Sequence, residues 1–88
     1  MSRTTYSVLF DPAALRDLKK MEVAVAARIM KEIEKLAQTP RPDGVRKMQG
    51  AADMYRLRVG DYRVIYRISD RTLTVLVVRV RHRKEVYR

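Results

Sequence analysis

The chain has 88 residues and a net charge of +10 at pH 7, with 47% apolar and 34% charged residues, a composition typical of one small basic globular domain. It contains no Cys and a single His, which excludes disulfides, thiolate metal sites and a polyhistidine metal site within one chain. No apolar stretch is long enough for a signal peptide or a membrane span, so we expect a cytoplasmic protein with one domain, residues 1–88.

The N-terminal segment predicts a strand followed directly by a helix. Residues 4–10 alternate in polarity, with one face formed by Tyr6, Val8 and Phe10. Asp11 and Pro12 are typical of a helix start, with Asp11 as the N-cap and Pro12 at the first helical position. Apolar residues then recur at helical spacing, which predicts a helix over 12–20.

A second helix is predicted over residues 23–38. Its apolar stripe consists of Ala26, Ile29, Met30, Ile33, Leu36 and Ala37. Residues 39–44 contain two prolines and a glycine, which end the helix and form a loop. Residues 45–50 follow with no clear period.

The second half of the chain predicts three consecutive strands. Residues 54–59 and 62–68 both alternate in polarity, and the Gly60-Asp61 pair between them is a two-residue hairpin signal. Residues 72–80 are apolar on both faces at their centre, which favours a central strand. The order β-α-α-β-β-β therefore predicts an α+β fold, with an antiparallel-rich four-stranded sheet and two N-terminal helices on one face.

The positive charge is concentrated in the second half. Residues 1–44 carry eight Lys or Arg against six Asp or Glu, a net charge of +2, whereas residues 45–88 carry twelve against four, a net charge of +8. Ten of those twelve are Arg, whose planar fork of donors matches phosphate oxygens. A polyanion such as nucleic acid is therefore the first partner to consider, with an acidic protein second.

Strand parity places four of these arginines together. If Gly60-Asp61 is the whole loop, Arg58 pairs with Arg63 and Arg56 pairs with Ile65. One face of the hairpin then carries Arg56, Arg58, Arg63 and Arg67 and no carboxylate, while the apolar residues lie on the other face. Like charges directly opposite each other destabilise a sheet, so this arrangement indicates an anion site.

The C-terminal segment, residues 80–88, would reach the same end of the sheet. No metal set, carboxylate pair or phosphate-binding glycine loop is present, and we expect neither a metal nor a cofactor. RNA supplies its own nucleophile, the 2′-OH, and arginines would stabilise the charge on the phosphate. Because arginine is a poor proton acceptor, His82 or Tyr87 would have to assist proton transfer.

The order and spacing of several segments resemble the RelE-like toxins of the RelE/ParE toxin–antitoxin superfamily. The resemblance spans essentially the whole chain and rests on residues 10–15, 47–50, 55–66 and 80–87. It implies a ribosome-dependent, metal-independent endoribonuclease that cuts mRNA in the ribosomal A site. The 2′-OH attacks the adjacent phosphate and a 2′,3′-cyclic phosphate is left, so that translation is inhibited.

The resemblance also implies roles for particular residues. By position, the catalytic set is Arg56, Arg58, Arg63, Arg83 and Tyr87, with His82 as a further proton-transfer group. The residues that we expect to contact RNA in addition are Arg46, Lys47, Arg67, Arg81 and Lys84. Two features depart from the family pattern: Arg56 and Arg58 stand where well-studied members have lysines, and we expect no C-terminal helix after Tyr87.

The family also implies partners and alternatives. The expected partners are a cognate antitoxin and the ribosome with mRNA in its A site, with operator DNA bound only by the toxin–antitoxin complex. One alternative is a ParE-like gyrase poison, although members of that branch usually lack the Tyr87-type residue and the dense hairpin arginines. Another is a non-catalytic module that binds nucleic acid or the antitoxin.

Overall fold

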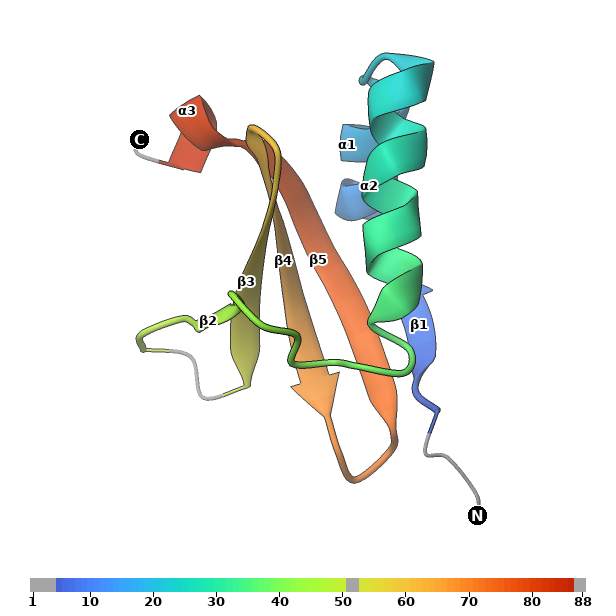
Figure 1. Cartoon of the computed structure of the whole chain (residues 1–88), viewed down its shortest axis with the longest axis vertical. Helices are drawn as coiled ribbons and strands as arrows, with labels where there is room; N and C mark the ends of the chain where they lie inside the picture. The colour runs from blue at the N-terminus through green and yellow to red at the C-terminus, as the bar shows by residue number, and fades with distance from the viewer. Residues whose placement is uncertain (1–4, 51–52, 87–88) are drawn as a thin grey trace.

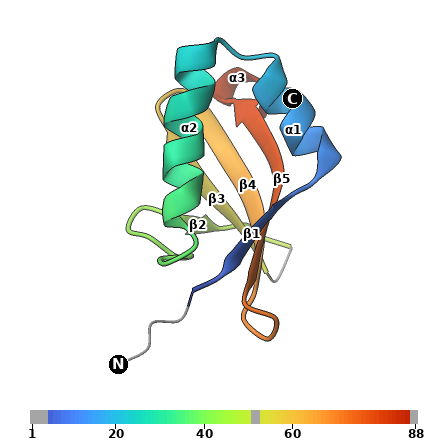
Figure 2. The same ribbon diagram turned by 90° about the vertical axis from the view of Figure 1, so that its right-hand side faces the viewer.

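The computed structural model describes residues 5–50 and 53–86, and Figures 1 and 2 show their arrangement. The elements are β1 (Ser7–Phe10), α1 (Pro12–Lys19), α2 (Val23–Lys35), β2 (Arg46–Lys47), β3 (Met54–Val59), β4 (Tyr62–Ser69), β5 (Thr74–His82) and α3 (Arg83–Val86). The predicted α+β class is confirmed. The sheet has five strands rather than four, because two residues after the proline loop pair with β3. The single helical turn α3 was also not expected.

The strands lie in the order β1-β5-β4-β3-β2. β1 is parallel to β5, and every other neighbouring pair is antiparallel. The apolar centre of β5 correctly predicts an interior strand, although β4 and not β5 occupies the middle of the sheet. The short strand β2 leaves most of β3 at the edge, next to the site described below.

Helices α1 and α2 lie on the same side of the sheet (Figure 1) and cover the core. The buried apolar residues of this core are Ala14, Leu18, Ile29, Ile33, Leu36, Val59, Val64, Tyr66, Ile68, Val75, Val77 and Val80. Tyr66 is fully buried and its hydroxyl donates to the carbonyl oxygen of Pro40 at 2.7 Å. Burial raises the pKa of the Tyr66 phenol, so the hydroxyl remains a donor.

The start of α1 agrees with the sequence pattern. The side chain of Asp11 accepts a hydrogen bond from the backbone N–H of Ala13 at 2.9 Å, and Pro12 occupies the first helical turn. This cap satisfies one of the N–H groups that a helix start leaves without an internal partner. The chain therefore turns from β1 into α1 without a loop.

Asp17 of α1 joins the helix to β5 where β1 no longer flanks that strand. The pairing of β1 with β5 ends at Val77, and beyond it the carboxylate of Asp17 accepts a hydrogen bond from the backbone N–H of Val80 at 2.9 Å. It also accepts from Nε and Nη2 of Arg79 at 2.8 and 3.0 Å. Partial burial acts to raise the pKa of Asp17, but these bonds and the nearby arginine charges outweigh it and hold the pKa below its usual value.

Arg41 connects the proline loop to the turn between β4 and β5, where Asp70 lies. Its Nη1 and Nη2 donate to the two oxygens of Asp70 at 3.2 and 3.0 Å, and its Nε donates to the Tyr55 hydroxyl at 3.0 Å. The Tyr6 hydroxyl also donates to Asp70, at 2.6 Å. The bonds from Arg41 and Tyr6 lower the pKa of the Asp70 carboxyl. The loop that leads to β2 is therefore held at its start.

Replacing Asp17 by Ala should lower the free energy of unfolding by about 2 kcal/mol. The change removes three hydrogen bonds, two of them from a guanidinium, and leaves the N–H of Val80 without its acceptor. Urea denaturation at pH 7 measures the effect. Glu34→Ala, an exposed change on α2, is the control and should alter stability by less than about 0.5 kcal/mol.

The same variant should alter the acid dependence of stability. Since the pKa of Asp17 is lower in the folded chain than in the unfolded one, the carboxylate stabilises the fold above about pH 4, the value typical of an unfolded Asp. That stabilisation is lost as the pH falls through the folded-state pKa. The difference between wild type and Asp17→Ala should shrink below about pH 4. A difference that stays constant down to pH 2 would contradict this role.

Candidate nucleic-acid interface

The hairpin of β3 and β4 has the register predicted from its two-residue turn. Arg58 lies opposite Arg63, Arg56 lies opposite Ile65, and Val59 lies opposite Tyr62. Val59 is buried against the helices. Because alternate residues of a strand point to opposite faces, Arg56, Arg58 and Arg63 all lie on the face turned away from the helices.

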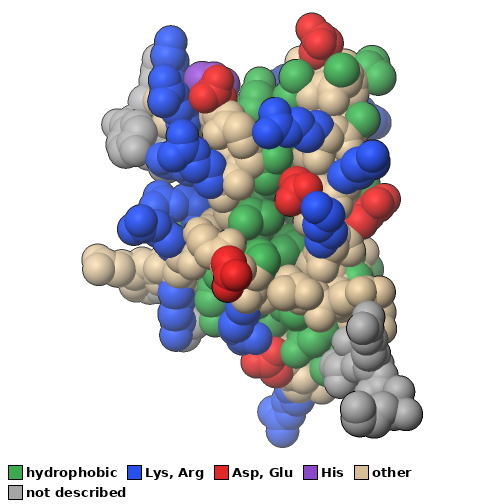
Figure 3. Space-filling model, in the orientation of Figure 1, with side chains coloured by type: hydrophobic (Ala, Val, Ile, Leu, Met, Phe, Trp, Pro, Cys, Tyr) green, Lys and Arg blue, Asp and Glu red, His purple; other side chains and the backbone are tan. Residues whose placement is uncertain are grey.

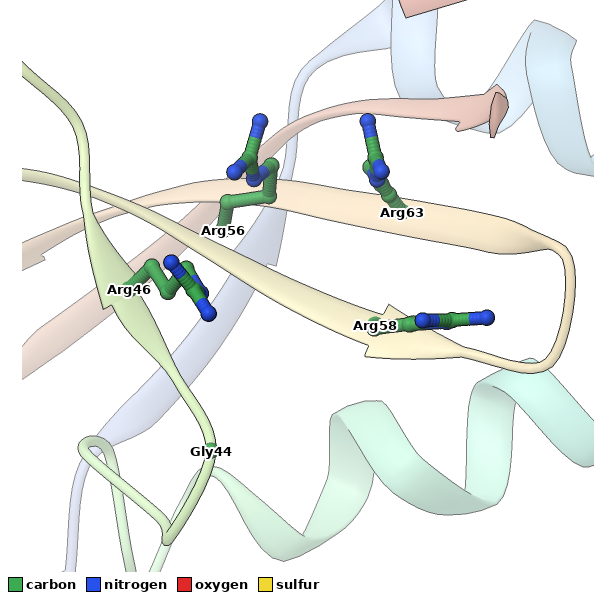
Figure 4. A pocket seen from close by; sticks show the side chains of 5 residues that line it. All are labelled: Gly44, Arg46, Arg56, Arg58 and Arg63. Carbon is green, nitrogen blue, oxygen red and sulfur yellow. The ribbon is translucent and has the colours of Figure 1, made fainter. Parts of the chain in front are cut away.

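A pocket of about 400 Å³ opens on this face. We call it the arginine pocket; Figure 4 shows its lining, which is Gly44, Arg46, Arg56, Arg58 and Arg63. The four guanidinium groups come from three different strands, β2, β3 and β4. No carboxylate lines the pocket among the residues that the structure describes. A phosphate group would find several two-point donors here.

A second pocket adjoins the first at the hairpin end of the sheet. It has a volume of about 290 Å³ and is lined by Arg58, Arg63, Arg83 and Lys84. Arg58 and Arg63 line both pockets, so the two hollows form one continuous basic surface. A polyanion longer than a single phosphate could therefore contact both at once.

Arg58, Arg63 and Arg81 form a row across three strands. Arg63 lies opposite Arg58 on one side and opposite Arg81 on the other. Like charges directly opposite each other destabilise a sheet by roughly 0.2–1 kcal/mol per pair. A bound anion would reverse this effect, because it lies close to all of the positive charges at once.

The short strand β2 separates two residues that we expected to act together. Arg46 pairs with Arg56 and lines the arginine pocket. Lys47 pairs with Tyr55 and so points to the other face, away from the pocket. Gly44, which has a φ of +87°, also lines the pocket. The sequence places Gly44 only in a loop, and the composition of that loop was the one signal that could have pointed to it.

Arg67 lies on the same face but farther along the hairpin. It pairs with Met54 and forms an ion pair with Asp53, with 3.4 Å between its Nε and an oxygen of Asp53. The prediction that no carboxylate accompanies the four hairpin arginines is therefore wrong at this end. Asp53 precedes the strand in sequence, so strand parity could not reveal it. The basic surface is concentrated around Arg58 and Arg63.

His82 lies apart from the arginine pocket. It is paired with Tyr62, and the two rings meet edge to face with centroids 5.2 Å apart. Tyr62 lies opposite Val59, which places this pair on the helix side of the sheet. Its Nδ1 accepts a hydrogen bond from the backbone N–H of Lys84 at 3.2 Å. The structure therefore places the imidazole on the opposite face of the sheet from Arg58 and Arg63.

Arg83 and Lys84 follow β5 and begin α3. Both are exposed and line the second pocket. The backbone N–H of Arg83 donates to the carbonyl oxygen of Asp61 at 2.8 Å, which fixes the start of α3 against the hairpin turn. Tyr87, the remaining residue of the expected catalytic set, lies outside the described residues.

The space-filling view shows how unevenly the charges are placed. In Figure 3, Lys and Arg side chains gather along the left-hand side of the molecule, whereas Asp and Glu alternate with them on the right.

Within residues 5–50 and 53–86 no cluster of three or more His, Asp or Glu is placed to hold a metal ion. In the same residues, no helix is long and apolar enough to cross a membrane.

Replacing Arg58 by Gln should raise the free energy of unfolding at low salt by about 0.2–1 kcal/mol. The change removes a like-charge contact with Arg63 at an exposed position. Thermal or urea denaturation in 20 mM and 500 mM salt tests this, since screening should reduce the gain at the higher salt. Arg71→Gln, a change in the β4–β5 turn, is the control. A loss of stability that is equal at both salt concentrations would contradict the expected repulsion.

Comparison with known proteins places this geometry in context. The family described as "ParE toxin of type II toxin-antitoxin system, parDE" matches residues 8–87. Toxin RelG of Mycobacterium tuberculosis is 34% identical over 84 residues, which cover 94% of this chain and 97% of RelG. The mRNA interferase toxin RelE of Escherichia coli is 33% identical over 86 residues, which cover 93% of this chain and 90% of that protein.

The fold is similar to a solved toxin structure as well. The toxin–antitoxin complex RelBE2 from Mycobacterium tuberculosis contains a chain that aligns with a TM-score of 0.80 and 32% identity. The alignment covers 92% of this chain and 94% of the other. The likeness therefore extends over the elements that carry the arginine pocket.

Proposed function

The chain belongs to the RelE/ParE family of type II toxin–antitoxin toxins, and we propose that it inhibits translation as an endoribonuclease that cuts mRNA in the ribosomal A site. The observation that carries the proposal is the row of Arg58, Arg63 and Arg81, of which the first two line the arginine pocket. Such a concentration of positive charge suits a phosphodiester backbone. The name of the E. coli relative, an mRNA interferase, supports RNA as the polyanion.

The proposed reaction uses the RNA's own nucleophile. The 2′-oxygen attacks the adjacent phosphorus while the bond from phosphorus to the 5′-oxygen breaks, and a 2′,3′-cyclic phosphate remains. The 2′-OH loses a proton and the departing 5′-oxygen gains one. Arg58, Arg63 and Arg83 would bind the phosphate and stabilise the negative charge that grows on it in the transition state.

The protein surface limits which groups take part in proton transfer. A guanidinium is a poor proton acceptor, so Arg56 and Arg58 would supply charge rather than a base. The Nδ1 of His82 already accepts a hydrogen bond, and its ring packs on Tyr62 on the other side of the sheet. We therefore retain Tyr87 and omit His82 from the catalytic set that we propose.

The proposed partners follow from the same surface. An antitoxin with acidic segments would cover the arginine pocket and keep the toxin inactive, as the net charge of +10 favours. RelBE2, the similar solved structure, is itself a toxin–antitoxin complex. We propose that the protein is cytoplasmic and that its target is the ribosome with mRNA in its A site. It would bind operator DNA only as part of the toxin–antitoxin complex.

Arg63→Ala and Arg83→Ala should each lower mRNA cleavage by about 10²–10³-fold while the protein remains folded, because each removes a preorganised donor to the phosphate. The measurement is an in-vitro translation reaction in which the mRNA ends are mapped against the position of the ribosome. Arg71→Ala, in the β4–β5 turn, is the matched control.

The same experiment tests the proposal itself. Wild-type protein should produce ribosome-dependent cuts within the A-site codon. The circular-dichroism spectra of both variants should match that of the wild type. Cleavage that persists unchanged in both variants would exclude the proposed site. Intact mRNA together with stabilised gyrase–DNA cleavage complexes would favour a gyrase poison, the alternative that the ParE description of the matching family supports.

Arg46→Gln should weaken the binding of single-stranded RNA and reduce the slope of log K against log salt by about 0.7, the effect of one lost phosphate contact. Both quantities are measured by fluorescence anisotropy at several salt concentrations. The probe is a labelled RNA oligonucleotide in which a 2′-deoxy sugar at the cleavage site prevents cutting. Lys47→Gln provides a matched control, since Lys47 is the neighbouring residue but points to the other face. Equal changes in the two variants would argue against the arginine pocket as the RNA site.

A further inference from the structure

The Gly60-Asp61 turn does more than connect β3 to β4. Gly60 has a φ of +59°, a left-handed conformation that suits glycine, whereas Asp61 is not among the positive-φ residues of the described chain. This combination is that of a two-residue hairpin with glycine first. The turn therefore requires its glycine but places no demand on the side chain at position 61.

The turn contacts two arginines of the second pocket. The carbonyl oxygen of Gly60 accepts from Nε of Arg58 at 3.3 Å. The carbonyl oxygen of Asp61 accepts from the backbone N–H of Arg83 at 2.8 Å, and its carboxylate lies 3.9 Å from Nε of the same residue. Arg58 and Arg83 come from β3 and α3, so one turn joins two separate elements of the site.

We propose that Asp61 is a positioning residue, whose carboxylate orients the Arg83 guanidinium toward the phosphate of the bound RNA. This inference rests on the proposed function and extends it to a residue outside the expected catalytic set. The Arg83 side chain is 54% exposed and has many rotamers open to it. In the conformation that places its Nε 3.9 Å from the Asp61 carboxylate, Arg83 lines the second pocket. The main-chain bond alone fixes the backbone of Arg83 but not its guanidinium.

The carboxylate has two opposing effects on the site. It orients Arg83, which aids the reaction, but it also repels a phosphate, which weakens binding. The Asp61 side chain is 66% exposed, so each effect is moderate. Removing the charge should therefore strengthen RNA binding while it slows cleavage. A residue with a purely structural role would not produce this opposition.

The test is Asp61→Asn in the full-length toxin, which changes the charge without altering the turn. RNA affinity, measured with a non-cleavable single-stranded oligonucleotide, should rise about two- to five-fold at low salt. The maximal rate of mRNA cleavage on programmed ribosomes should fall about five-fold. Asp61→Glu restores the charge and should recover most of the rate. Glu34→Gln, which removes an exposed charge from α2, is the control for net charge.

Arg83→Gln supplies the second half of a double-mutant cycle. In the Arg83→Gln background, Asp61→Asn should have no further effect on the cleavage rate, because the group that it orients is gone. The Nε–Hε resonance of Arg83, assigned by its loss in Arg83→Lys, should shift and exchange faster with solvent in Asp61→Asn. This signal reports the orientation of Arg83 independently of any catalysis.

Several results would overturn the inference. An unchanged cleavage rate with stronger binding would mean that Asp61 only repels RNA, and a joint loss of stability, affinity and rate would mean that it only supports the fold. A fall of more than 100-fold with an altered pH profile would instead indicate direct proton transfer. If the wild type cleaves no mRNA, the proposed function fails, and an unperturbed Arg83 resonance in Asp61→Asn would then also exclude the positioning role.

Discussion

The geometry of the basic surface depends on the two-residue connection between β3 and β4, because that connection determines which side chains share a face. Because the turn has only two residues, Arg58 must pair with Arg63. A slip of one residue would turn the arginines toward the helices and expose Val59 and Val64, which are now buried. The cost of burying unpaired guanidinium groups opposes this slip as strongly as the loss of apolar burial does.

The division of labour between the two faces of the sheet follows from this register. Both long helices pack on the same side, where the apolar residues of β3, β4 and β5 form the core. The other side can then carry a row of like charges whose repulsion opposes folding. Proteins commonly retain such locally unfavourable arrangements at functional sites, where the stability lost is made up elsewhere. Here the apolar core and the bonds of Asp17 stabilise the fold.

Sequence patterns predicted the elements that have a clear period. The alternation of Tyr55, Leu57 and Val59, followed by Gly-Asp, was sufficient for the hairpin register and for the placement of Arg56, Arg58 and Arg63. Strand β2 escaped prediction because two residues cannot display a period. Arg46 was expected to contact RNA, but the pairing with Arg56 that directs it into the pocket, and Lys47 away from it, could not be foreseen.

The remaining differences arise from contacts between distant parts of the chain. Asp53 meets Arg67 only because the segment before β3 lies beside β4. The irregular pairing of β4 with β5 between Ile65 and Tyr66 shifts the parity of β5, so the faces of Arg81 and His82 could not be obtained by counting along that strand. The turn carbonyls that hold Arg58 and Arg83 leave no trace in residue type, since any residue has a carbonyl.

The parallel pairing of β1 with β5 has a consequence for how this protein comes into being. The first strand has its partner in the last one, and Asp17 binds an N–H that lies 63 positions further along the chain. Contacts of such high sequence separation form late, after the loop between them has been closed. During synthesis the N-terminal strand and α1 must wait until β5 has left the ribosome. Until then Asp17 lacks the groups of β5 that it binds in the folded chain, so the N-terminal segment cannot complete its packing without the second half of the domain.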